Sequence, residues 1–447
     1  MFVPIHQSDT SSVDLIKSYL ESVQMSTINN KWGITDTIIS IISDYQTSNG
    51  GDIIPQKWKI DLEILYNKID VFSLLFKWYF FAGLILLIFC IVLIFYNKDN
   101  QKQLTAEEKS LLIKIKKRNR KIVFYSAICL FIINYVLQLV LEESLEIPPI
   151  LWFITLIFPF FISLFNQTYR RSINVIIIFR YLIYVGWGLH TLGLIAIWII
   201  SNHAPWTNGY EAMIYTVWAT MFAGIIFGRK SDLTLATTTL VSSMLLLFAF
   251  VSFLDPTITN VVPVLNSYWL MIHVSIIVAS YGFFVLGAFL GLLSLILTII
   301  KTKKTKSILE LKISELTIIN EKSLIIGVYM LTIGTFLGGV WANESWGRYW
   351  GWDPKEAWAL VSVLVYAFIL HMRFIPGLKS KMTFNIASVF AIYSILMTFF
   401  GVNHLLSGLH SYAAGDDVGI PVYVWISVFI VIVITLVSSW NDKRIKS

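Results

Sequence analysis

The feature that most constrains this chain is a series of apolar stretches, each long enough to cross a lipid bilayer. A transmembrane helix needs about 20 mainly apolar residues, and the sequence holds about 11 such stretches. Only 14% of the 447 residues are charged, against roughly 25% in soluble proteins. We therefore predict an all-α, polytopic transmembrane helical bundle, which excludes a soluble enzyme, a secreted disulfide scaffold and a disordered chain. The predicted spans are 74–96, 122–141, 150–166, 174–200, 210–228, 234–254, 268–300, 323–341, 357–375, 384–402 and 420–439.

The distribution of basic residues predicts which side of the membrane each loop occupies. Segment 97–121 has nine Lys/Arg against three acids, segment 301–322 has six Lys against three acids, and the C-terminal tail is basic. Alternate loops, such as 201–211 and 403–421, contain no Lys or Arg. The positive-inside rule places the first group in the cytoplasm and the second outside. The net charge of +7 is thus a topology signal, and we expect no nucleic-acid partner.

The alternation of sides divides the chain into three predicted parts. Residues 1–73 form a polar segment that the alternation places outside, although no signal peptide precedes it. We expect either a longer ancestral polypeptide or help from an assembly partner to explain that placement. Residues 74–173 form a first group of spans, and residues 174–447 form the main membrane domain.

The two cysteines are interpreted as structural residues, whereas histidines include candidate ligands. Cys90 and Cys129 each lie in an apolar run without a CxxC pattern, so we interpret both as core thiols. Histidine is the commonest metal ligand and can bind haem iron, and an ionisable residue within a span is a functional candidate. A hydrogen-bonded structural role is equally open for a lone histidine in a span. The seven histidines are His6, His190, His203, His273, His371, His404 and His410.

The segment 341–358 concentrates tryptophan: five of the chain's 16 fall within it, together with Gly, Asp and Glu. One interpretation is an aromatic belt at the membrane interface. The other is a flat apolar surface for a large planar ligand such as haem, with polar groups to orient it. We expect a Trp-rich external loop over these residues.

This segment also carries a family resemblance. Trp346–Glu356, WGRYWGWDPKE, resembles the tryptophan-rich WWD signature of haem-handling cytochrome c assembly proteins. The continuation through Trp358, with Tyr366 and His371–Arg373, is similar to the CcsA/ResC branch of system II. Residues 204–211, 401–403 and 407–412 are similar to external loops of that branch. The resemblance covers roughly 175–440; the part before it looks like the tail of the partner-like region in fused CcsBA-like proteins.

The resemblance implies haem b bound as a substrate. It implies that His273 and His410 ligate the iron on the outer side and that His371 belongs to an inner, intramembrane site. In the family, the second inner ligand comes from a ResB/CcsB-type partner. The first three predicted spans contain no histidine, so His190 remains open as a substitute. We interpret His404 as a neighbour of His410, and His203 and His6 as solvated loop residues.

The implied function is cytochrome c biogenesis in a bacterial inner membrane. The chain would present haem on the periplasmic side and support thioether attachment to Cys-x-x-Cys-His of apocytochrome c, as a haem lyase component with its ResB-type partner. The residues expected to support the reaction are Trp346, Trp350, Trp352, Asp353 and Glu356. Those expected to hold haem besides the histidines are Trp341, Trp358 and Arg348.

Several alternatives remain open at this point. Asp353 and Glu356 fit equally well as an N-terminal cap of the following helix. Arg348 and Lys355 fit either haem propionates or anchoring at the interface. The whole chain could also be a haem or other solute transporter without lyase activity, or a non-catalytic membrane scaffold.

Overall fold

The computed structural model describes residues 10–50, 55–96, 169–251, 254–258, 267–409 and 420–446. The chain forms two compact units, Met1–Lys68 and Ile69–Ser447. The first unit contains α1 (Thr10–Asn29) and α2 (Gly33–Gly50), and α3 (Lys57–Ile69) ends at its boundary. A hydrogen bond of 2.7 Å between the Ser26 and Thr35 hydroxyls joins α1 to α2. The polar segment predicted before the first span is therefore helical where it is described.

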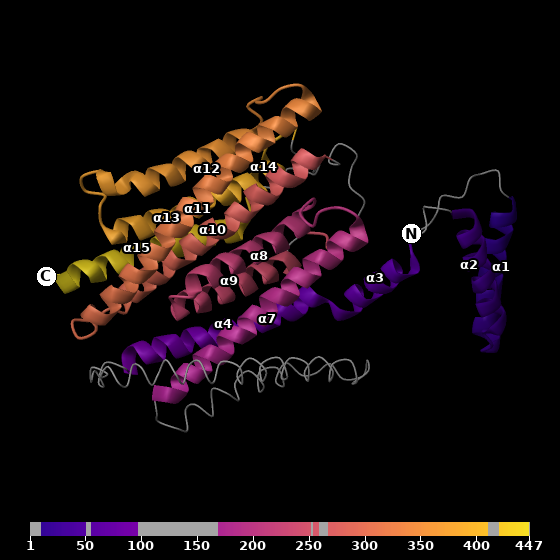
Figure 1. Ribbon diagram of the computed structural model, residues 1–447, viewed down its shortest axis with the longest axis horizontal. Helices are drawn as coiled ribbons and strands as arrows, with labels where there is room; N and C mark the ends of the chain where they lie inside the picture. Colours follow the sequence, from indigo (N-terminus) through magenta and orange to yellow (C-terminus); the bar gives the residue numbers. More distant parts are fainter. Residues whose placement is uncertain are drawn as a thin grey trace. The chain divides into compact units, whose positions relative to one another are not determined.

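The second unit is a helical bundle, in agreement with the predicted fold class (Figure 1). Nine helices among the described residues are long and apolar enough to cross a membrane, and they coincide with nine of the predicted spans. The predicted spans 122–141 and 150–166, with Cys129, lie outside the described residues. The helices of this unit are α4 (Val71–Tyr96), α7 (Tyr169–Ser201), α8 (Gly209–Gly228), α9 (Asp232–Val251), α10 (Tyr268–Ile299), α11 (Lys306–Trp346), α12 (Pro354–His371), α13 (Lys381–Leu396), α14 (Val402–Leu405) and α15 (Val422–Lys446), with a 3₁₀ turn η3 (Met372–Phe374) and a π-helical turn η4 (Met397–Gly401).

Helix α10 organises the bundle because it packs against α8, α9, α11, α13 and α15. Its glycines permit close approach: a Cβ added at Gly282 would lie 2.6 Å from the backbone nitrogen of Thr220 on α8. Small residues at such crossings let membrane helices approach closely and gain van der Waals contact. On the opposite face, Phe284 of α10 stacks on Tyr366 of α12 with centroids 4.0 Å apart. Both rings belong to a buried cluster shared by α10, α11, α12 and α13.

Hydrogen bonds made by asparagine side chains join the helices at the end of the bundle away from the Trp-rich segment. Asn320 of α11 donates to Asn385 (3.2 Å) and to Ser388 (2.8 Å), both on α13. Asn441 of α15 donates to three carbonyls at the end of α10, those of Thr298, Ile299 and Lys301. The last carbonyls of a helix lack the full set of helical partners, so the Asn441 amide provides donors to this end of α10 and links it to α15.

Candidate functional site

The Trp-rich segment is less of a loop than the sequence suggested. Helix α11 continues through Trp346, and Gly347 ends it with a left-handed backbone (φ 71°). Helix α12 then begins at Pro354. The expected loop over 341–358 is therefore a connection of residues 347–353, flanked by two helix ends that carry Trp341, Trp346 and Trp358. Glycine is favoured at such a helix end because it adopts a left-handed backbone without steric cost.

Asp353 and Glu356 form a reciprocal cap at the start of α12. The Asp353 carboxylate accepts a hydrogen bond from the backbone N–H of Lys355 (3.2 Å). The Glu356 carboxylate reaches back and accepts from the backbone N–H groups of Asp353 (3.2 Å) and Gly351 (2.8 Å). This is the capping box that the sequence allowed as one of two interpretations, with Pro354 at the first helical position.

His273 lies near the N-terminal end of α10 and packs against the end of α11. It is 6% exposed. Its ring stacks on Trp341 with centroids 5.5 Å apart, and Trp341 in turn meets Trp346 edge-on at 4.7 Å. A Cβ added at Gly338 would lie 3.2 Å from the His273 ring, so glycine provides room for the imidazole. The sequence did not indicate this role for Gly338, although its position three residues before Trp341 places it on the same face of α11.

The hydrogen bond of His273 selects one tautomer. Its Nδ1 lies 2.8 Å from the backbone carbonyl oxygen of Trp269. Because a carbonyl oxygen can only accept, Nδ1 carries the proton and Nε2 of the neutral ring carries the lone pair. Ligating histidines commonly donate their second ring N–H to such a group, which fixes the ring orientation and raises its basicity. The residue is thus in a state suited to iron ligation through Nε2.

The remaining side chains of the connection are half-buried or exposed. The Arg348 guanidinium sits over the Trp346 ring at 5.8 Å and lies 4.0 Å from the Glu356 carboxylate. Trp350 and Trp352 meet edge-on with centroids 5.7 Å apart. Trp352 is 72% exposed and has a left-handed backbone (φ 58°). Such a backbone is uncommon for a bulky residue and costs conformational free energy.

The start of α12 also contacts the last loop of the bundle. The second oxygen of the Asp353 carboxylate accepts from the backbone N–H of Leu409 at 2.6 Å. Lys355 donates to the Asn403 side chain on α14 at 3.1 Å. His404 lies on α14 as well. His410, the second expected outer ligand, lies outside the described residues.

The loop between α7 and α8 packs against α10 close to His273. Trp206 donates its indole N–H to the carbonyl of Met271, two residues before His273 (3.1 Å). The expectation that His203 is solvated is wrong: its side chain is 10% exposed and its Nδ1 lies 3.1 Å from the Thr207 hydroxyl. Glu211 accepts from the Thr207 backbone N–H at 2.9 Å. The loop is therefore folded, and hydrogen bonds connect its residues to one another and to α10. His6 lies outside the described residues.

His371 is the last residue of α12, at the end opposite the Trp-rich segment. An α-helix rises about 1.5 Å per residue, so the 18 residues of α12 separate His371 from Pro354 by about the thickness of a bilayer core. The ring is exposed, and its Nδ1 lies 2.7 Å from the carbonyl of Ala367. The same argument as for His273 leaves the Nε2 lone pair directed away from the helix backbone.

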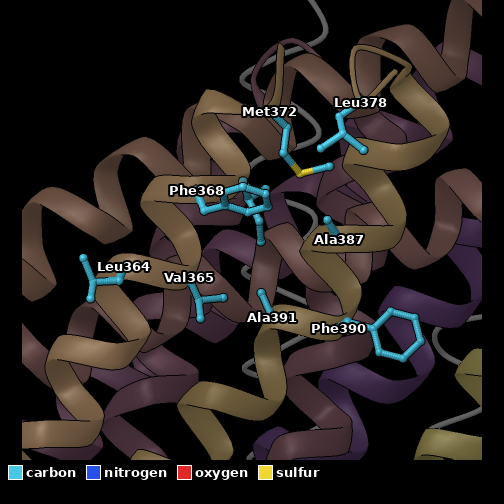
Figure 2. A pocket seen from close by; sticks show the side chains of 9 residues that line it. Leu364, Val365, Phe368, Met372, Leu378, Ala387, Phe390 and Ala391 are labelled. Atoms are coloured by element: carbon cyan, nitrogen blue, oxygen red, sulfur yellow. The ribbon is translucent and has the colours of Figure 1, made fainter. Parts of the chain in front are cut away.

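A groove of about 590 Å³ lies between α12 and α13, and Met372, the residue that follows His371, lines it (Figure 2). Its lining is apolar, and Figure 2 shows Phe368 of α12 and Met372 of η3 on one side and Ala387 and Ala391 of α13 on the other. No histidine is among the described residues that line it. The groove borders the candidate inner ligand without containing an iron-binding nitrogen.

His190 has a different environment from the two candidate ligands. It is fully buried on α7, and its Nε2 lies 3.1 Å from the carbonyl of Ile214 on α8. Phe72 and Tyr79 of α4 enclose the ring, with centroids 5.2 and 6.3 Å away. A ring enclosed in this way joins three helices, so the structural role is favoured over the open possibility of an inner ligand.

Comparison with known proteins adds independent evidence. Residues 206–410 match the model of the cytochrome C assembly protein family. The chain is 37% identical over 378 residues to Protein NrfI of Wolinella succinogenes, which covers 85% of the chain and 34% of NrfI, so the chain spans about a third of that protein. It is 32% identical over 277 residues to the cytochrome c biogenesis protein CcsA of Prochlorococcus marinus, covering 56% of the chain and 86% of that CcsA. The CcsA of Chlamydomonas reinhardtii is 36% identical over 234 residues, covering 50% of the chain and 65% of that protein.

Proposed function

Because the chain belongs to the cytochrome c assembly protein family and takes part in cytochrome c biogenesis, we propose that it binds haem and supports its covalent attachment to apocytochrome c. In this proposal haem b is the substrate. The Trp-rich segment holds the porphyrin on the outer side of the membrane, and His273 and His410 ligate its iron. A bacterial cytoplasmic membrane is the expected location.

One observation carries the proposal: the stacking of His273 on Trp341 at a Trp-rich helix end, with Nδ1 of the imidazole bonded to the Trp269 carbonyl. Tryptophan rings provide flat apolar contact area for a planar macrocycle. Arg348, next to them, offers a guanidinium for a propionate. A plain interfacial anchor would need neither a histidine with its tautomer set by a backbone carbonyl nor an arginine beside it.

His371 is proposed as the inner iron ligand. It lies on the exposed side of α12, beside an apolar groove. A six-coordinate iron there requires a second ligand from another helix. We propose that a ResB/CcsB-type membrane partner supplies it.

The chemistry assigned to the chain is positioning. Haem supplies two vinyl groups, and each cysteine thiol of the Cys-x-x-Cys-His motif adds across one of them: a C–S bond forms and the thiol proton moves to the neighbouring vinyl carbon. No net electrons are transferred in this addition. Holding two reactants in the right geometry replaces a collision in solution, which is worth an effective concentration of about 10⁵ M or more in well-oriented cases. The half-buried Trp350 and the exposed Trp352 are proposed to present the vinyl edge to the incoming thiols.

The test measures bound haem and product together. The full chain is expressed with its partner, and the haem absorption spectrum and the yield of a Cys-x-x-Cys-His reporter cytochrome are recorded. We expect His273→Ala and His371→Ala each to lose haem and yield, while Tyr268→Phe, at an exposed ring on the first turn of α10, retains both. Wild-type haem content and yield in both histidine variants would contradict the proposal. Bound haem without thioether product in the wild type would support the transporter alternative instead.

A further inference from the structure

We infer that the first turn of α12 fixes the end of the last loop, with Asp353 as a positioning residue for the chain that enters His410. We call this pair of contacts the α12 clamp: Asp353 with Leu409, and Lys355 with Asn403. The inference rests on the proposed function, in which His410 is the second outer iron ligand. It gives Asp353 a role in ligand geometry that goes beyond capping its own helix.

The first contact is made by a carboxylate that serves two partners at once. Asp353 is 6% exposed. One of its oxygens accepts from Lys355 N–H within the helix, and the other accepts from Leu409 N–H, 56 residues further along the chain. The second distance, 2.6 Å, is shorter than the first, 3.2 Å. Hydrogen bonds to an ionised acceptor are shorter and stronger than neutral ones, so both contacts of this carboxylate are charge-assisted.

The glycine at position 408 is required for this approach. A Cβ added there would lie 2.5 Å from the Asp353 carboxylate oxygen and 2.8 Å from the Pro354 ring. A side chain larger than hydrogen at this position would therefore displace either the loop or the Asp353 and Pro354 side chains. The sequence therefore provides both an acceptor on α12 and an open approach in the loop.

The second contact comes from the same turn. The Lys355 ammonium donates to the Asn403 side-chain oxygen at 3.1 Å, and Asn403 also donates to the carbonyl of Phe399. The clamp therefore contacts the chain both at α14 and at Leu409, just before His410. A chain segment fixed at two points has fewer conformations to lose when its next residue binds iron.

Ordinary helix caps elsewhere in the bundle do not need a carboxylate. The Asn208 side chain caps α8 through one oxygen to Glu211 N–H (2.8 Å), and the Ser380 hydroxyl caps α13 through Thr383 N–H (3.0 Å). Each side chain satisfies one backbone donor of its own helix. Asp353 has two acceptor oxygens, and the extra one is used across the bundle. Capping alone does not explain that use.

The primary test is Asp353→Asn in the full chain with its partner. Asparagine retains one carbonyl oxygen for the cap, but its NH₂ group cannot accept from the second N–H. Groups that orient a ligand from outside the first coordination shell typically change metal affinity by about 10–100-fold. We expect at least a tenfold loss of outer-site haem affinity, a shift of the remaining haem from the low-spin to the high-spin absorption spectrum, and a changed reduction potential.

A second variant separates positioning from folding. Gly408→Ala leaves Asp353 and the α12 cap intact but pushes the loop away from the carboxylate, so we expect it to reproduce the same spectral and potential changes. Ser380→Ala is the matched control, because it removes a cap hydrogen bond without touching the last loop. We expect it to lower thermal stability slightly and to leave the haem spectrum unchanged.

The outcomes distinguish the clamp from the proposed function. A wild-type chain that binds no haem overturns the proposed function itself. Haem in the wild type, with an unchanged spectrum and potential in both Asp353→Asn and Gly408→Ala, overturns the clamp alone. If Asp353→Asn yields no folded protein, the Gly408→Ala result decides: altered spin state supports the clamp, and an unaltered one refutes it.

Discussion

The imidazole of His273 stacks on the indole of Trp341, with ring centroids 5.5 Å apart and planes inclined by 26°. The two residues come from neighbouring helices, α10 and α11, which make the most extensive helix pair in the bundle. Trp341 is 1% exposed, so the tryptophan is a fixed wall rather than a mobile interface anchor. The candidate iron ligand is therefore held from one side by a ring and from the other by its backbone hydrogen bond.

We predict that Trp341→Ala destabilises the protein and also lowers haem binding. Truncating a buried tryptophan to alanine costs about 3–5 kcal/mol through lost contacts and the cavity left behind. Trp341→Phe retains a stacked ring and should recover most of the haem affinity at a smaller loss of stability. Thermal unfolding in detergent, followed with the haem spectrum, measures both effects. Equal haem binding in the alanine and phenylalanine variants would exclude a role for the stacked ring.

We predict that substitution of Trp352 lowers the yield of product without lowering the stability of the protein. A left-handed backbone costs a non-glycine residue about 1–2 kcal/mol. Trp352→Gly and Trp352→Asn both relieve that cost, and both remove an indole that is 72% exposed. We expect unchanged or slightly higher thermal stability together with reduced yield of the reporter cytochrome. A wild-type yield in both variants would show that the indole is dispensable.

His190→Ala should act on stability alone. The substitution removes the hydrogen bond to the Ile214 carbonyl and opens space beside Phe72 and Tyr79. A buried hydrogen bond contributes about 0.5–1.5 kcal/mol, and the cavity adds to the loss. The thermal midpoint should fall, while haem content per folded molecule should match the wild type. Loss of the haem spectrum in the folded fraction would make His190 an iron ligand after all.

The anchoring of α15 should be sensitive to a single amide. Asn441→Ala removes the donor to three carbonyls at the end of α10, and we expect a loss of about 1–3 kcal/mol. Lys443→Ala, an exposed change on the same helix, provides the control and should have little effect. Thermal unfolding and limited proteolysis of α15 measure the difference. Identical stability of the two variants would remove Asn441 from the anchoring of α15.

The proposed orientation can be tested by labelling single introduced cysteines in intact cells. Ser407→Cys, in the last loop, should react with a membrane-impermeant maleimide from outside. Thr302→Cys, between α10 and α11, should react only after permeabilisation. Both positions are exposed in the structure, so access to the reagent decides the result. The opposite pattern would reverse the proposed topology.

Much of the fold was predictable because hydropathy is a local property. A run of apolar residues identifies a span without knowledge of its neighbours, and the nine long apolar helices of the described residues lie where the sequence placed them. Helix ends were less predictable. The polar residues that begin at Lys306 were assigned to a loop, but they form the first part of α11. Residues with good helix propensity extend an adjacent helix, because propagation of a helix is favourable once a turn has formed.

The candidate site was predictable as a list of residues but not as an arrangement. The sequence identified the Trp-rich segment and left Asp353 and Glu356 divided between capping and chemistry; the structure shows the cap. The sequence did not indicate that Gly338 leaves room for the His273 ring or that Gly408 allows the Asp353 carboxylate to approach the loop. The signal for both is a glycine whose missing side chain matters only when another helix or loop approaches.

The sequence by itself determined that this chain spans a membrane, approximately where its helices lie and which residues could meet haem. Tertiary structure alone decided which of those residues meet one another. His273 and Trp341, or Asp353 and Leu409, are brought together by helix packing, which depends on small residues and hydrogen bonds at crossings distant in sequence. A local sequence pattern carries no information about such contacts, because each residue is compatible with its own helix whether or not the other residue lies nearby.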